Sequence, residues 1–240
     1  FSLCGVTLGY SDKWLQQLPQ QVLEGKFTLK DLFEFGNASA LQGITSYGVV
    51  YRSIPGIFHY MIAKKFGAVS INTEGDIQYN RDRLIEMLSY FHDNAQHADT
   101  SLPSDTKRIA EVFAQKQAAV YMGACWSLGN IATLYGDEIV PQLIESYIPI
   151  LLPAHDFSQI PSTMSNTMLI TIAKNSKYKN ELKEIIAEAY SDWDANAKHS
   201  SNTYHMPISI SAVKKMATYG NLFLQNNLYM LDYTEFAPNT

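Results

Sequence analysis

Cys125 and Trp126 adjoin in the stretch 121-YMGACWSLGN-130, and both side-chain types can do chemistry where they stand. The stretch ends an apolar run and begins a helix-like pattern, so both residues are predicted at a strand-to-helix corner. An indole there can stack on the apolar C–H face of a sugar, or it can pack between strand and helix. A thiol at a helix N-terminus gains acidity and nucleophilicity. Since no histidine stands near Cys125 in the sequence, a binding role for Trp126 is favoured over a catalytic Cys125.

Arg52 is a further candidate for a binding site. It follows Tyr51 near the end of a predicted strand. A planar guanidinium group can fork onto sugar hydroxyls or onto a carboxylate. An ordinary surface arginine is the alternative interpretation.

Sequence motifs that would support catalysis are scarce. Neither a Gly-rich phosphate loop nor a G-x-S-x-G elbow is present. His92 and His97 do not have the spacing of zinc ligands and are interpreted as solvated helix-end residues. Asp192 and Asp194 flank Trp193, and two close carboxylates can act as acid and base. Because they follow a charged helix, a solvated helix end fits better, and no metal, cofactor or enzyme activity is predicted.

The composition is that of an ordinary globular protein. Its 240 residues are 46% hydrophobic and 17% charged, which is enough for one large domain or two small ones. The net charge is −5 and no basic run exists, so no nucleic-acid partner is expected. Fifteen tyrosines suit a wet, partly apolar binding surface. The sequence shows no apolar run long enough to span a membrane, and its two cysteines, Cys4 and Cys125, leave their pairing open.

Hydrophobic periodicity predicts an α/β chain with a partly parallel sheet, because helices alternate with short strands. Residues 1–10 are expected to form a strand or an extended crossing. One helix should be capped by Thr28, with Asp31 three residues on. Further helices are predicted over 57–67, 81–96, 137–146 and 177–193. Two more should begin at 104 or 105 and near 126, and one or two should lie within 207–230. Strands are predicted over 44–53, 118–123, 147–153 and 163–173, and a hairpin over 71–80. The helix over 177–193 should turn inward the residues Leu182, Ile185, Ile186 and Ala189.

Several stretches in a fixed order carry a family resemblance. They are 9-GYSDKWLQQL-18, 19-PQQVLEGKFTLKDLFEF-35, residues 84–131, residues 148–190 and 206-MPISISAV-213. Together they resemble the extracellular solute-binding proteins of bacterial ABC importers, in the carbohydrate-binding group to which maltose-binding protein belongs. Each motif alone is weak, but the set covers almost the whole chain.

The strongest of these matches precedes Trp126. In the family a helix delivers a phenylalanine, and after a tight turn a buried strand ends in glycine and tryptophan. Here those positions are Phe113, the strand 118–122, Gly123 and Trp126. One residue more than in the common G-x-W spacing separates Gly123 from Trp126, which puts the orientation of the indole in question.

The resemblance implies a two-lobed, periplasmic-binding-protein-like (type II) α/β fold, represented mainly by its second lobe. Residues 1–13 would cross between the lobes, 14–146 and 207–240 would form the second lobe, and 147–206 would return to the first. The family's first β/α segment has no counterpart here. The chain is therefore expected to be a fragment truncated at its N-terminus, or a shortened member.

The resemblance also implies a function. The protein would be a non-enzymatic monomer that binds a sugar or oligosaccharide between the lobes and delivers it to a membrane permease. It would act in the periplasm or at the outer face of the cell membrane, there held by a lipid anchor. The predicted ligand-binding residues are Trp126, Arg52, Phe58, Tyr60, Tyr10 and Asp12. Two alternatives stay open: the same architecture with a polyamine, peptide or metal complex as ligand, and a hydrolase-like enzyme that uses Cys125.

Overall fold

The structure, a computed structural model, describes residues 2–51, 56–94, 106–156, 161–165, 170–207 and 209–236. It is a mixed α/β structure that is about 59% helical. The α/β class is thus confirmed. The strands among the described residues are shorter than the sequence pattern suggests, with three to five residues each.

Helices dominate the described part of the chain. The α-helices are α1 (Ser2–Thr7), α2 (Asp12–Gln16), α3 (Leu18–Leu23), α4 (Leu29–Leu41), α5 (Ile57–Lys65), α6 (Arg81–Asn94), α7 (Thr106–Ala114), α8 (Ser127–Tyr135), α9 (Ile139–Ser146), α10 (Lys179–Ser191), α11 (Trp193–Thr203), α12 (Ile210–Met216) and α13 (Leu222–Asn226). Two 3₁₀ segments are η2 (Ala217–Tyr219) and η3 (Leu228–Tyr233). Most of the predicted helices are confirmed, with ends that differ by a few residues.

The strands pair two by two. Strand β1 (Tyr47–Tyr51) runs parallel to β4 (Ala118–Met122), and β5 (Thr163–Ser165) runs parallel to β6 (Thr234–Phe236). Strands β2 (Val69–Ile71) and β3 (Ile77–Tyr79) form the predicted antiparallel hairpin. Parallel pairs are thus present, but the described strands form three separate two-stranded sheets and not the one partly parallel sheet that was expected.

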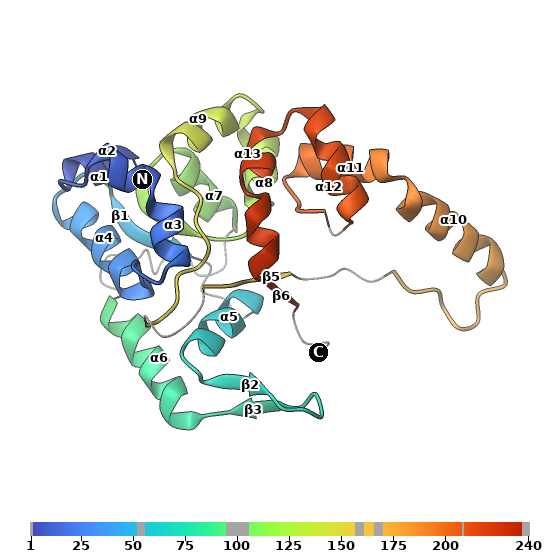
Figure 1. Ribbon diagram of the computed structural model, residues 1–240, viewed down its shortest axis with the longest axis horizontal. Coiled ribbons are helices and arrows are strands. Elements are labelled where there is room, and N and C mark those ends of the chain that lie inside the picture. The colour runs from blue at the N-terminus through green and yellow to red at the C-terminus, as the bar shows by residue number, and fades with distance from the viewer. Residues whose placement is uncertain are drawn as a thin grey trace.

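Helix α4 is tied closely to β1 (Figure 1). Its N-terminus has the predicted capping box, in which the Thr28 N–H donates to Asp31 Oδ2 at 2.7 Å and the Asp31 N–H donates to Thr28 Oγ1 at 3.4 Å. Further along, a methyl group placed at Gly48 would lie 2.9 Å from the backbone carbon of Gly36. The helix and the strand thus meet backbone to backbone, as only glycine allows.

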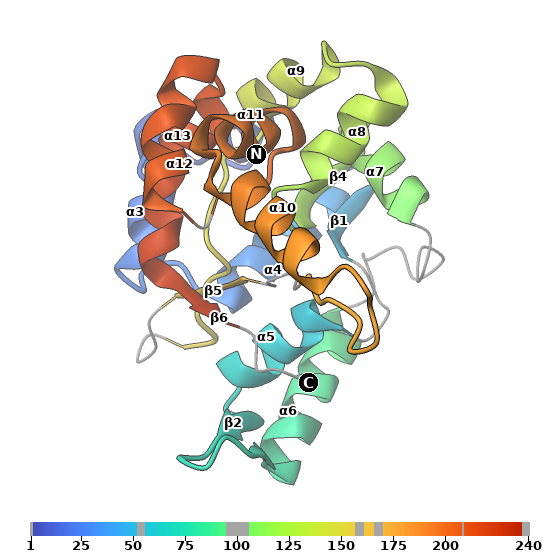
Figure 2. The same ribbon diagram turned by 90° about the vertical axis from the view of Figure 1, so that its right-hand side faces the viewer.

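The buried side chains form separate clusters. The largest is built from α1 to α6, β1, β2 and β4, with Leu151 from the segment after α9. Another lies between α7, α8 and α9, and a third between α11, α12 and α13. Helix α10 projects from the rest of the molecule at the right of Figure 1 and toward the viewer in Figure 2, and it has no buried residue.

The expected strand over 1–10 is wrong, because residues 2–7 form α1. Cys4 is buried in the largest cluster and Leu8 packs against it, a spacing of four residues that fits a helical face. Gly9 has φ +89°, so it ends the helix rather than interrupting a strand. Packing of the apolar face decides the local structure, and the sparse β-branched residues do not oppose it.

Three other expectations also need correction. Residues 147–153 form no strand, although Leu151 is buried. In the segment predicted over 163–173, only Thr163–Ser165 is a strand among the described residues. In α10 the supposedly inward Leu182 and Ile185 are exposed, because no described element covers this helix.

Candidate functional site

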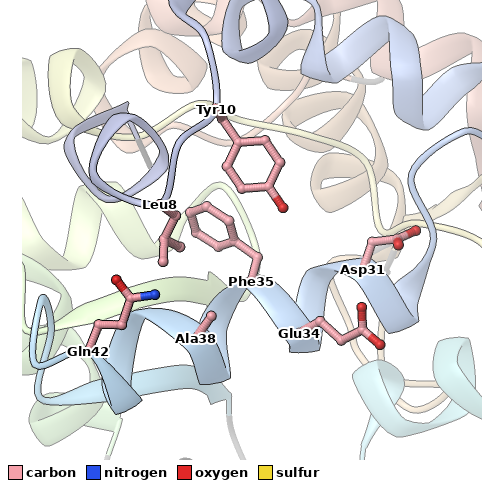
Figure 3. Close-up of a pocket in the computed structure, with 7 residues that line it drawn as sticks. All are labelled: Leu8, Tyr10, Asp31, Glu34, Phe35, Ala38 and Gln42. Atoms are coloured by element: carbon pink, nitrogen blue, oxygen red, sulfur yellow. The ribbon is translucent and has the colours of Figure 1, made fainter.

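A surface pocket opens where the turn between α1 and α2 passes over α4 (Figure 3). Its volume is about 270 Å³. The lining residues are Leu8, Tyr10, Asp31, Glu34, Phe35, Ala38 and Gln42. We call it the Tyr10 pocket. It combines aromatic, apolar and hydrogen-bonding groups, which is the mixture that small-molecule sites commonly use.

The turn after α1 fixes the position of Tyr10. The Gly9 N–H donates to Val6 O at 3.0 Å and the Tyr10 N–H donates to Gly5 O at 2.9 Å, which is a Schellman ending with glycine at the left-handed position. Ser11 then caps α2, its hydroxyl accepting from the Trp14 N–H at 3.2 Å. Both ends of the turn are held, so backbone hydrogen bonds fix the point from which the Tyr10 side chain leaves the chain.

Two aromatic neighbours support the Tyr10 ring. Trp14 stacks on it with ring centroids 4.5 Å apart and planes at 29°. Phe35 lies 5.8 Å away in a tilted arrangement. Such pairs add stabilisation beyond burial alone. Tyr10 is therefore a supported ring that stays half-exposed at the wall of the pocket.

Helix α4 supplies the polar groups. Asp31 and Glu34 are three residues apart, so both carboxylates lie on one face of the helix. Gln42 follows the last residue of α4 and lies at the opposite end of the pocket, with Leu8 and Phe35 between (Figure 3). The Tyr10 hydroxyl points toward the side on which Asp31 and Glu34 lie. A ligand in the pocket would meet carboxylates at one end and an amide at the other.

The protonation state of Tyr10 suits hydrogen bonding. Burial raises the pKa of its phenol, and the negative charges of Asp31 and Glu34 raise it further. The hydroxyl therefore stays protonated near neutral pH and can donate to a ligand. The carboxylates accept hydrogen bonds, and the Gln42 amide can do both.

Tyr10 and Asp12 are both residues that the sequence singles out, but they have different positions. Tyr10 lines the pocket. Asp12 is exposed in the first turn of α2 and is not one of the lining residues. An acidic residue in that turn interacts favourably with the helix dipole, which accounts for its position without a ligand.

Phe58 and Tyr60 lie on α5, and neither lines the pocket. Phe58 stacks against Tyr51 with ring centroids 5.8 Å apart. Both residues pack against the largest buried cluster, and the Tyr60 hydroxyl is buried with no hydrogen-bond partner among the described residues. Packing therefore accounts for the position of the Phe58 ring, and a ligand-binding role for Phe58 and Tyr60 stays a prediction. Arg52 lies outside the described residues.

Trp126 stands at the predicted corner between β4 and α8, as the N-cap residue of α8. The corner is held by the Tyr121 hydroxyl and Ser127 Oγ, 2.8 Å apart, and by the Tyr121 ring stacked on Phe113 at 4.7 Å. The indole is 39% exposed, so it is not a core residue. It does not line the Tyr10 pocket, and its role as a sugar-stacking surface stays a prediction.

Cys125 does not have the character of an activated nucleophile. Burial raises the pKa of its thiol, although backbone hydrogen bonds, including one from Met206, oppose that shift. A thiol with a raised pKa is mostly protonated at neutral pH and is a poor nucleophile. Cys4 and Cys125 are both free thiols.

Sequence reasoning missed most of the pocket. It assigned Asp31 only to helix capping, and Glu34, Phe35 and Gln42 were not singled out at all. The available signal was a pair of carboxylates three residues apart on the polar side of an amphipathic helix. That pattern is common on solvated helices. The pocket forms because the turn that contains Tyr10 passes over this face of α4.

Every helix in the described ranges is too short or too polar to cross a lipid bilayer. Comparison of the chain with protein-family models, with curated proteins and with solved structures finds no match.

Proposed function

We propose that this chain is a non-enzymatic sugar-binding protein, and that the Tyr10 pocket is where it holds the sugar. The observation that carries the proposal is the combination of groups in that pocket: a supported aromatic ring beside two carboxylates and an amide. Sugars present an apolar C–H face edged by hydroxyls. An aromatic ring covers the face, and carboxylate and amide groups bind the hydroxyls.

The volume of the pocket limits the size of the ligand. Small-molecule sites commonly have volumes of about 300–1,000 Å³. At about 270 Å³, the Tyr10 pocket is slightly smaller than that range. It has room for one sugar ring rather than for several, so an oligosaccharide would place only one unit inside it.

The resemblance to ABC-importer binding proteins supplies the wider part of the proposal. In that setting a two-lobed type II architecture would close around the sugar by hinge motion, and the closed form would dock on a permease. The protein would work as a monomer in the periplasm or at the outer face of the membrane. Support comes from the ordered family-like stretches, including the strand, corner and helix that contain Trp126.

Isothermal titration calorimetry with a panel of mono- and oligosaccharides tests the proposal. At least one sugar should bind, and Tyr10→Ala should weaken it by about 5- to 150-fold, the range for stacking on an aromatic ring taken from nucleobases. Tyr79→Ala is the control, because Tyr79 is a largely exposed tyrosine of β3 outside the pocket. If the folded chain binds none of the sugars, the proposal is wrong.

A further inference from the structure

The polar lining of the Tyr10 pocket is acidic. Asp31 and Glu34 supply two carboxylates, and the lining residues include no lysine, arginine or histidine. Gln42 and Tyr10 are neutral. A ligand that enters this pocket therefore meets a negative charge with no basic side chain in the lining to balance it.

The hydrogen bonds of Asp31 do not remove its charge. Its Oδ2 atom accepts from the N–H and the hydroxyl of Thr28, each at 2.7 Å. Both donors are neutral, and both bonds end on the same oxygen. Neither bond brings a positive charge to the carboxylate, and its Oδ1 atom can still accept a hydrogen bond from a ligand.

Glu34 has a basic neighbour, but the pair is weak. Lys30 Nζ lies 3.5 Å from Glu34 Oε1, with side chains that are 71% and 61% exposed. Exposed pairs of this kind contribute little, because water and salt screen them. The charge of Glu34 is also felt inside the pocket, since it contributes to the raised pKa of the Tyr10 phenol.

We propose that the ligand of the Tyr10 pocket is an amino sugar with a free ammonium group, an inference that rests on the sugar-binding function proposed above. The apolar face of the ring stacks on Tyr10, the ammonium group lies between Asp31 and Glu34, and hydroxyl groups reach Gln42. The ammonium balances the carboxylates and also gains from the electron-rich face of the aromatic ring. A uronic acid would meet like charges in the same place.

Matched pairs of sugars test this inference in calorimetric titrations of the whole chain. The pairs are glucose with glucosamine, galactose with galactosamine and mannose with mannosamine, which differ in each case only at C2. At roughly 20 mM salt, one amino sugar should bind about 3- to 30-fold more tightly than its neutral partner, the range for exposed ion pairs and cation–π contacts. The ratio of the two affinities should fall at roughly 300 mM salt, because salt screens the charges more strongly there. The N-acetylated form should lose the advantage.

Two substitutions of glutamate by glutamine test whether the preference for the amino sugar arises in the Tyr10 pocket. Glu34→Gln should weaken binding of the amino sugar more than binding of the neutral sugar, because the amide can still bind a hydroxyl group but carries no charge to pair with the ammonium. Glu145→Gln makes the same change in net charge on an exposed residue of α9 outside the pocket, and should leave the preference intact.

The outcomes separate the two proposals. Neutral sugars that bind as tightly as their amino partners, or a preference that survives Glu34→Gln, would overturn the ammonium assignment and leave the sugar-binding function standing. A linear diamine such as putrescine that binds more tightly than every sugar would overturn the sugar-binding function with it. Binding of none of these ligands by the folded chain would overturn both.

Discussion

Trp126 is exposed at the corner between β4 and α8, and its removal tests what an exposed indole does there. Because the Trp126 side chain is 39% exposed, Trp126→Ala should cost less stability than the loss of a buried ring. We expect less than about 2 kcal/mol, against about 3–5 kcal/mol for Phe33→Ala in the largest cluster. Urea denaturation of both variants measures this.

The same variant tests the binding role predicted from sequence. If Trp126 contacts the sugar, Trp126→Ala should weaken the titrated affinity while the unfolding midpoint changes little. A large fall in the midpoint with unchanged affinity would show that the residue serves packing only.

Lys65, the last residue of α5, is a buried cation. It is only 6% exposed, and its Nζ atom donates to Ser162 Oγ at 2.7 Å. Burial, and then the charge of Lys64, lowers its pKa from 10.5 to about 8. Between these two pH values the unfolded state therefore holds more protons than the folded state, so stability rises with pH across the window. Below pH 8 the full cost of the buried charge is present.

Lys65→Met should accordingly stabilise the protein at pH 7 by up to about 3 kcal/mol, reduced by loss of the bond to Ser162. It should also flatten the rise in stability between pH 8 and 10.5. Denaturation curves at several pH values measure both effects. Lys177→Met, at an exposed position, is the control. If the stability of Lys65→Met rises between pH 8 and 10.5 as steeply as that of the original protein, Lys65 does not titrate in that range.

The contact between α4 and β1 depends on two glycines. A methyl group at Gly48 would lie 2.9 Å from backbone atoms of Gly36, which cannot rotate away as a side chain could. Gly48→Ala should therefore destabilise the fold by about 1–3 kcal/mol, the usual cost of overpacking. Ser46→Ala, at an exposed position just before β1, should change little. Equal unfolding midpoints for the two variants would mean that the helix and strand are not in close contact.

Helix α10 exposes apolar side chains that the sequence pattern suggests are buried. Ile185 is 61% exposed, and Glu181 lies one turn before it. Ile185→Lys should leave the melting temperature nearly unchanged, since a favourable Glu–Lys spacing replaces an uncovered apolar residue. It should also reduce binding of a hydrophobic dye. A marked loss of stability would mean that this face is covered in solution, whereas Leu143→Ala in the buried cluster of α9 should show such a loss in any case.

At the scale of the whole molecule, the sequence predicts the elements better than it predicts their packing. The capping box at Thr28, the hairpin over β2 and β3 and the corner at Trp126 are confirmed, because each depends on residues close together in the chain. The strands predicted over 1–10 and 147–153 were wrong. Helix α1 buries Cys4 against residues that lie far away in the chain, which a local pattern does not show, and 147–153 is irregular although it is apolar.

The candidate site was predictable only in part for the same reason. Tyr10 was singled out, but Asp31, Glu34 and Gln42 come from a helix that the sequence assigns to packing and capping. The pocket exists only because the turn at Gly9 carries Tyr10 over α4. A pattern along one helix does not reveal which turn passes above it.

Tryptophan fluorescence measures most directly whether the sugar occupies the Tyr10 pocket. Trp14 stacks on Tyr10, so a sugar bound there should change its emission. With the tightest-binding sugar of the panel, we predict that the emission change is lost in Trp14→Phe and kept in Trp193→Phe, while calorimetry confirms that both variants bind. The emission change in Trp126→Phe shows separately whether the indole at the β4–α8 corner contributes to the signal. An emission change in Trp14→Phe equal to that of the original protein would contradict binding at the Tyr10 pocket.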